Sequence, residues 1–197
     1  MECSKDPRTV WVFGTPDEKW TKPCIQTYKK GKDISLGVFG CFYGSKRGIF
    51  TPIVMKTVDM FLYKKILEQV VQPVYAEVDQ KFDGKGIFMQ NNAPYHTGAI
   101  PAIYLAVEDW NIMIWPPNSP DLNPIEHVWV RLKDKLQEHF PEVVTMGGGA
   151  KTIKVRLTEV LPLCWETIEP EFFKSLWHSM PARVEAVIEA KGWYTKY

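Results

Sequence analysis

The stretch "GIFMQNNAPYHTG", residues 86–98, joins a short apolar run to the chain's single Asn-Asn pair, a proline and a histidine. The apolar run at 86–90 predicts a short buried strand. Asn and Pro are common where a strand ends in a turn, and Thr97 is placed to cap a helix that follows. Taken alone, this stretch is therefore a strand, a turn and the start of a helix.

A second distinctive stretch, "WPPNSPDLNPIEHVW", occupies residues 115–129. Four prolines between 116 and 124 exclude a helix there and predict a stiff, extended path. Asn123 can then cap a helix with Pro124 in its first position, and the apolar spacing predicts that this helix runs to about 139. Glu126 fits a capping box at that helix start, where the helix dipole favours an acid. Asp121 lies in the Pro-rich loop, where a turn-stabilising or capping role is expected.

The remaining pattern predicts alternating strands and helices. Strands are expected at 9–13 and 34–43, joined as a hairpin with a long connection, and a short apolar strand at 111–115. Helices are expected at 57–72, closed by Pro73, at 98–110, and, after the flexible "MGGG" at 146–149, at about 153–168 and 172–191. Because a helix connects the strands at 86–90 and 111–115, these two strands are expected to be parallel.

Composition sets broad limits on the class of protein. A chain of 197 residues suits one domain, and its net charge of +1 argues neither for nor against a nucleic-acid partner. The four cysteines form no CxxC pair, which disfavours a zinc site and predicts reduced thiols. No apolar run approaches the roughly 18 residues of a membrane span. A nuclear or cytoplasmic protein, neither secreted nor membrane-bound, is the expectation.

The two stretches together resemble the catalytic domain of Tc1/mariner-type transposases, a group of the DDE superfamily endonucleases. In that family the first motif reads QDNAPxHT and the second WPPxSPDLNPIExxW. The family places 34 residues between its second catalytic Asp and its last acid, and 34 residues also separate Asn91 from Glu126 here. The segments "WVFGTPDEKW" (11–20), "IQTYKKGKDIS" (25–35) and "MPARVEAVIEAKGWYTKY" (180–197) look like the branch of the family found in filamentous fungi.

The resemblance implies an α/β fold, the ribonuclease H-like mixed sheet flanked by helices. It implies that the chain is N-terminally truncated, with the first strand largely missing, and that it ends in a helical appendage. The expected organisation is an incomplete ribonuclease H-like core at 1–145 and a helical extension of the same domain at 146–197. The family's reaction is DNA strand cleavage and transfer, in which three acidic side chains hold two Mg2+ or Mn2+ ions.

The resemblance also assigns the site residues. Glu126 matches the third acid, and Asn91 stands at the position of the second Asp. Met1 stands at the position of the first Asp, where its thioether would not hold Mg2+. Glu2 does not replace it, because neighbouring residues of a strand point to opposite faces. Metal binding by Glu126 and Asn91 is therefore expected to be weakened or lost, since a neutral amide does not offset the charge of a dication.

Two functions remain open at this point. The first is a degenerate transposase domain from a DNA-transposing family, impaired in catalysis, so whether the chain is an active enzyme is uncertain. The second is a non-catalytic module that binds nucleic acid or a full-length transposase, or associates with itself. DNA is the partner that the family implies, and no small-molecule substrate is expected. The basic segment "YKKGKD" (28–33) could contribute only a modest contact to DNA phosphates. His96 belongs to the motif but is expected to form a local hydrogen bond. A start codon placed too late is also open, and would leave Asn91 unchanged.

Overall fold

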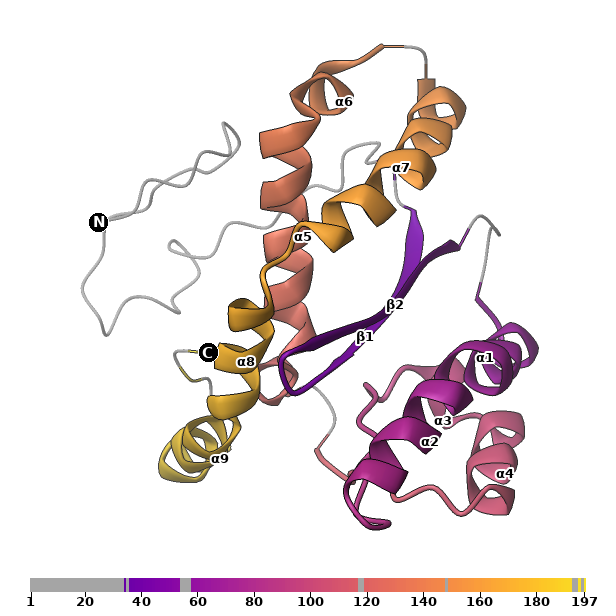
Figure 1. The fold of residues 1–197 in the computed structure, drawn as a ribbon, viewed down its shortest axis with the longest axis vertical. Helices are drawn as coiled ribbons and strands as arrows, with labels where there is room; N and C mark the ends of the chain where they lie inside the picture. The colour runs from indigo at the N-terminus through magenta and orange to yellow at the C-terminus, as the bar shows by residue number, and fades with distance from the viewer. Residues whose placement is uncertain are drawn as a thin grey trace. The chain divides into compact units, whose positions relative to one another are not determined.

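The computed structural model describes residues 34, 36–53, 58–116, 119–147, 149–192, 195 and 197 (Figure 1). The predictions for residues 1–33, which include a strand at 9–13 and the basic segment at 28–33, lie outside the described residues. Among the helices of the described ranges, none combines the length and the apolar composition needed to cross a membrane.

An antiparallel hairpin opens the described chain. Strand β1, Gly37–Tyr43, pairs with β2, Lys46–Ile53, and Tyr43 faces Lys46 across a two-residue turn. Gly44 has a φ of +55° in this turn, a conformation that glycine adopts without steric cost. The expected strand at 34–43 is therefore confirmed over most of its length. Its partner strand β2 was not predicted.

The predicted helix at 57–72 begins later and ends later than expected. Helix α1, Met60–Ile66, starts after Asp59, whose carboxylate accepts a 2.8 Å hydrogen bond from the backbone N–H of Leu62. A wide π-turn, η3 (Leu67–Val71), then leads into α2, Gln72–Lys81. The prediction that Pro73 closes the helix is wrong. Pro73 sits in the first turn of α2, and the wider turn before it accommodates a residue that has no N–H and crowds the preceding turn.

The two apolar runs at 86–90 and 111–115 meet at a single parallel bridge between Phe88 and Ile112. The expected parallel direction is confirmed, but each of the two expected strands is reduced to this bridge, and the expected burial of the strand at 86–90 is wrong at Ile87. Ile87 is 56% exposed and Ile114 is 96% exposed. The pairing is short because the turn at Asn91 and the proline at 116 each take the backbone away soon after the bridge.

Helices account for most of the remaining described chain. The short α3 (Pro94–Thr97) leads directly into α4 (Ala99–Val107), in agreement with the helix predicted at 98–110. After the 3-10 turn η4 (Pro120–Leu122), α5 spans Ile125–His139, as predicted. The C-terminal part forms α6 (Pro141–Thr145), α7 (Gly149–Glu166), α8 (Pro170–His178) and α9 (Met180–Glu189). Helices α7 to α9 agree with the helices predicted at about 153–168 and 172–191, but α7 begins earlier, within the predicted break at 146–149, and α6 was not predicted.

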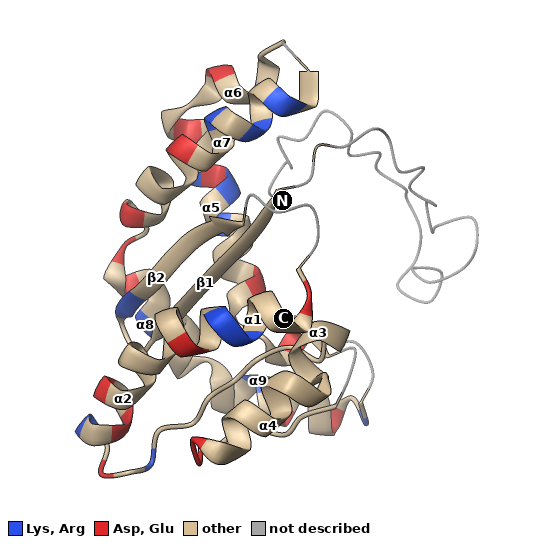
Figure 2. Ribbon diagram, turned by 90° about the vertical axis from the view of Figure 1, so that its right-hand side faces the viewer, with Lys and Arg blue, Asp and Glu red and all other residues tan. Residues whose placement is uncertain are grey.

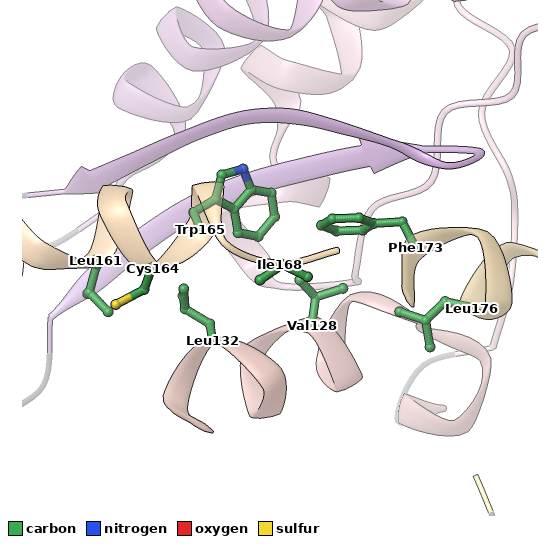
Figure 3. Packing of buried hydrophobic residues seen from close by; sticks show 8 residues of the cluster. All are labelled: Val128, Leu132, Leu161, Cys164, Trp165, Ile168, Phe173 and Leu176. Atoms are coloured by element: carbon green, nitrogen blue, oxygen red, sulfur yellow. The ribbon is translucent and has the colours of Figure 1, made fainter. Parts of the chain in front are cut away.

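One hydrophobic core joins the hairpin to the later helices. Figure 3 shows Val128 and Leu132 of α5 facing buried side chains of α7 and α8, with the hairpin on the other side of the cluster. Trp165 of α7 is buried at the centre, and its ring stacks on Phe50 of β2 at a centroid distance of 5.1 Å. Its indole N–H donates to the Gly48 carbonyl at 3.1 Å. These contacts hold α5, and with it Glu126, against the hairpin.

A second core lies under α1, η3 and α4. Tyr63, Leu67 and Val71 are buried at intervals of four residues, and they pack with Leu105 and Trp110. This core supports the segment that carries Asn91, because Tyr63 also contacts Gln90 and His96 of that segment.

Candidate functional site

Asn91 lies in an exposed turn just after the Phe88–Ile112 bridge. Its side-chain oxygen accepts a 3.1 Å hydrogen bond from the backbone N–H of Ala93, which closes a local Asx turn. The turn expected from the residues alone is thus present. The expected cap at Thr97 is wrong. Thr97 is the last residue of α3, and its hydroxyl donates back to the Ala93 carbonyl at 3.4 Å instead of capping α4.

His96 supports this turn. Its Nδ1 lies 3.0 Å from the Asn91 carbonyl, and its ring packs against Tyr63 at a centroid distance of 4.0 Å. Burial lowers the pKa of His96, and the hydrogen bond to the Asn91 carbonyl opposes that effect. Since a carbonyl only accepts, Nδ1 carries the proton in this arrangement. The expected local hydrogen bond is therefore present.

Three further side chains fix the backbone on both sides of Asn91. The indole N–H of Trp115 donates to the Gln90 carbonyl at 2.8 Å, and the Tyr63 hydroxyl donates to the Gln90 side chain. Asn92 donates from its amide to the Trp115 carbonyl at 3.3 Å. The chain after Phe88 and the chain after Ile112 are thus tied together beyond their single backbone bridge.

Glu126 projects from the first turn of α5 and is exposed. One of its carboxylate oxygens accepts a 3.3 Å hydrogen bond from the amide of Asn123, and the Asn123 side-chain oxygen accepts from the Ile125 N–H at 3.4 Å. The predicted capping box is therefore not formed: Pro124, not Asn123, is the N-cap residue of α5, and the bond between Asn123 and Glu126 joins two side chains. Asn123 is buried, so the carboxylate of Glu126 is held by a fixed neighbour.

Asp121 has a structural role in η4. Its Oδ2 accepts hydrogen bonds from the backbone N–H and the hydroxyl of Thr195, at 2.8 and 2.6 Å. The position of Asp121 in the Pro-rich loop predicts a local turn or cap. The contact instead reaches a residue near the far end of the chain, a partner that local patterns cannot reveal.

Charged residues elsewhere on α5 to α7 are intermixed, as the alternating red and blue segments of Figure 2 show. Arg156, for example, pairs with Glu142 at 3.5 Å and with Glu159 at 3.0 Å. Such exposed pairs contribute little to stability and leave no strong local potential of either sign.

The metal-ligating residues implied by the resemblance do not form a complete site within the described ranges. Asn91 and Glu126 come from different elements, and neither side chain is hydrogen-bonded to the other. Met1 and Glu2 lie outside the described residues. Within the described part of the chain, no three His, Cys, Asp or Glu side chains are arranged to hold a metal ion. One carboxylate and one neutral amide do not fit a pair of dications, which need several anionic oxygens.

Comparison with known proteins assigns the chain to a family. Residues 5–146 match the model of the DDE superfamily endonuclease family. The chain is 33% identical to the transposable element Tcb1 transposase of Caenorhabditis briggsae, over 94% of this chain and 66% of that protein. It is 32% identical to the transposable element Tc1 transposase of Caenorhabditis elegans, again over 94% and 66%. The chain therefore spans 66% of the length of these relatives.

Solved structures agree in fold. The Mos1 transposase catalytic domain, in a structure with raltegravir and Mg, superposes with a TM-score of 0.64 at 21% identity, over 82% of this chain and 77% of that one. The Mos1 mariner paired end complex with Mn gives a TM-score of 0.62 at 20% identity, over 94% and 51%. This likeness confirms the predicted ribonuclease H-like fold class.

Proposed function

The chain belongs to the DDE superfamily endonucleases, among the Tc1/mariner transposases, and we propose that it is a transposase domain of DNA transposition whose metal-dependent cleavage is impaired at Asn91. The family implies Mg2+ or Mn2+ as cofactor. Asn91 and Glu126 are the described residues that would contact such ions, and the ions would be held weakly there if at all.

The observation that carries the proposal is the chemistry of the Asn91 side chain. Asn91 is separated from Glu126 by 34 intervening residues, at the place of a family aspartate, yet its amide is neutral. Its oxygen already accepts the Ala93 N–H. A neutral oxygen neither offsets the charge of a dication nor bridges two ions as a carboxylate does. A carboxylate at this position would keep the bond to Ala93 and add the missing charge.

DNA is the proposed partner of this domain. Mos1 transposase, which shares the fold, has been solved as a paired-end complex with the left transposon end. Contacts with a full-length transposase, or with a second copy of this chain, belong to the same proposal. If the domain acts on chromosomal DNA as proposed, we expect it to be located in the nucleus and not in the cytoplasm. The division of the chain at 145/146 also stays a prediction.

The decisive experiment compares the wild-type protein with Asn91→Asp and Glu126→Ala. Calorimetric titration with Mn2+ should give at most weak binding for the wild type. Asn91→Asp should bind at least about tenfold more tightly, because it adds an anionic oxygen at the position of the family's second acid. Asn111→Asp is the matched control, since it adds the same charge on an exposed side chain outside both motifs.

A nicking assay on plasmid DNA with Mg2+ or Mn2+ gives the functional result. The wild type should not exceed Glu126→Ala. Robust nicking by the wild type that Glu126→Ala abolishes would refute the impairment. Saturable DNA binding at physiological salt without metal, together with absent nicking in Asn91→Asp, would favour the non-catalytic module instead.

A further inference from the structure

The loop that leads into α5 is tied to the C-terminal part of the chain by a set of five residues, Asp121, Ser179, Arg183, Thr195 and Tyr197, which we call the α9 clasp. Arg183 of α9 donates from Nη1 to the Asp121 carbonyl at 2.8 Å and from Nε to the Ser179 hydroxyl at 2.8 Å. Asp121 in turn receives both hydrogen bonds from Thr195. The clasp therefore binds the same loop residue through its backbone and its side chain.

Arg183 is the anchor of the clasp. Its side chain is only 2% exposed, although it carries a charge. Burial lowers the pKa of Arg183, and the charges of Tyr197 and Asp121 oppose that effect. The guanidinium also lies 4.7 Å from the centre of the Tyr197 ring. Removing one partner from a buried charge is costly, so the clasp resists opening.

Thr195 links Asp121 to Tyr197 within the clasp. Its hydroxyl donates to Asp121 Oδ2 at 2.6 Å and accepts the backbone N–H of Tyr197 at 3.2 Å. Both hydrogen-bonding functions of one small side chain are thus used. A valine at this position would keep the shape of the side chain and lose both hydrogen bonds of the hydroxyl. The backbone N–H of residue 195 could still donate to Asp121.

Hydrogen bonds join η4, the 3-10 turn that contains Asp121, to Asn123 and Glu126 at the start of α5. The Asn123 N–H donates to the Pro120 carbonyl at 2.9 Å, and the Glu126 N–H donates to the Asn123 carbonyl at 3.2 Å. The Asn123 side chain then holds the Glu126 carboxylate. Because Asp121 is fixed by the clasp and Asn123 is buried, a shift of η4 would be passed directly to Glu126.

We propose that Asp121, Arg183 and Thr195 are positioning residues that set the place of the Glu126 carboxylate through η4 and Asn123. The role of Glu126 as a retained acid rests on the proposed function above, whereas the mechanical coupling does not. Helix α9, through Arg183, thereby helps to position Glu126 at the start of α5.

Amide hydrogen exchange and NMR test the coupling without any metal. Thr195→Val should speed exchange of the Ile125 and Glu126 amides by about tenfold and shift the carboxylate resonance of Glu126. Thr195→Ser should restore both, because it keeps the hydroxyl. Thr158→Val is the matched control, since the Thr158 hydroxyl makes a 2.8 Å bond to the Lys154 carbonyl far along α7. Equal exchange changes at Glu126 and at Val160 in the core, or no change at Glu126, would overturn the proposal.

A second measurement connects the clasp to the proposed site. In Asn91→Asp protein, adding Thr195→Val should weaken Mn2+ binding about three- to tenfold, and Thr195→Ser should recover it. Unchanged Mn2+ affinity in the double variant would overturn the positioning role. If Asn91→Asp itself binds no Mn2+, the proposed function fails, and the exchange data alone still decide whether the clasp positions Glu126.

Discussion

The indole of Trp115 donates a 2.8 Å hydrogen bond to the backbone carbonyl of Gln90, the residue immediately before Asn91. Trp115 opens the second sequence motif and Gln90 belongs to the first, so one side chain joins the two motifs in space. The backbone pairs these segments only at Phe88 and Ile112. The geometry at Asn91 therefore depends on side chains more than on a sheet.

Replacing Trp115 with phenylalanine should loosen this junction. The variant keeps an aromatic ring and loses the donor to Gln90, so the free energy of unfolding should fall by about 1–2 kcal/mol. Urea denaturation measures the change. Asn92→Ala removes a longer bond made by an exposed side chain to the same tryptophan, and it should cost less than about 0.5 kcal/mol. Equal losses in the two variants would contradict the importance of the indole bond.

Gly40 of β1 lies beside the Trp129 ring of α5. A Cβ on this residue would lie 2.8 Å from the Trp129 ring and 3.3 Å from the Phe50 ring. Gly40→Ala should therefore lower the free energy of unfolding by about 1–3 kcal/mol. Adding Trp129→Leu should recover part of that loss, because it removes the atoms that clash.

Gly147→Ala serves as the control for this experiment, since a Cβ there meets no atom within 4 Å. It should leave the urea midpoint nearly unchanged. A similar loss in both alanine variants would show that backbone conformation, and not the contact with Trp129, makes glycine necessary at 40.

His96 should titrate below the ordinary histidine pKa of about 6.5, because burial disfavours its charged form. A pKa lowered by folding means that the unfolded chain binds more protons. The contribution of His96 is therefore fully present above about pH 6.5 and is lost as the pH falls through the lowered pKa. Proton NMR of the imidazole signals measures the pKa directly. A value at or above about 6.5 for His96 would contradict the burial seen against Tyr63.

Glu169 links α5 to the start of α8. Its carboxylate lies 3.0 Å from the Lys135 ammonium and 3.0 Å from the Arg131 guanidinium. Its own backbone N–H, then Lys135 and Arg131, lower the pKa of Glu169 to about 2. Stability from this group is thus present above the ordinary glutamate pKa and is lost as the pH falls toward 2.

Glu169→Gln should lower the free energy of unfolding by about 1 kcal/mol near neutral pH, since the side chain is 44% exposed and the pair is screened by water. The difference from wild type should shrink as the pH falls from about 4.5 to about 3. Urea denaturation at these pH values tests this. The same pH trend in Glu171→Gln, an exposed glutamate on α8, would rule out a specific role for Glu169.

The helices that were predicted well share a local cause. In α5 the proline at the helix start and the apolar positions Val128 and Leu132 all lie within one stretch of chain, although the N-cap residue is Pro124 and not the predicted Asn123. The same holds for α4, where Pro101 falls in the first turn. Helical spacing and capping are properties of neighbouring residues, so they can be recognised without knowing the fold.

The errors have non-local causes. Strand β2 contains Pro52, and its residues do not alternate regularly between exposed and buried positions. Its pairing with β1 is therefore apparent only in the tertiary structure. The Gly44–Ser45 turn was the available signal, because glycine between two apolar runs favours a tight hairpin. Pro73 predicts a helix end, because proline usually breaks a helix. The buried positions of Leu67 and Val71 show that packing kept this helix continuous through a π-turn.

The sequence by itself determined the family, the helices and the 34-residue spacing from Asn91 to Glu126, because motif spacing and helical periodicity are written along the chain. It also determined that position 91 is neutral. Only the tertiary structure decided that Asp121 meets Thr195, 74 residues away, and that Trp115 holds Gln90. Contacts between distant segments form only when the whole core packs, so no local pattern records them.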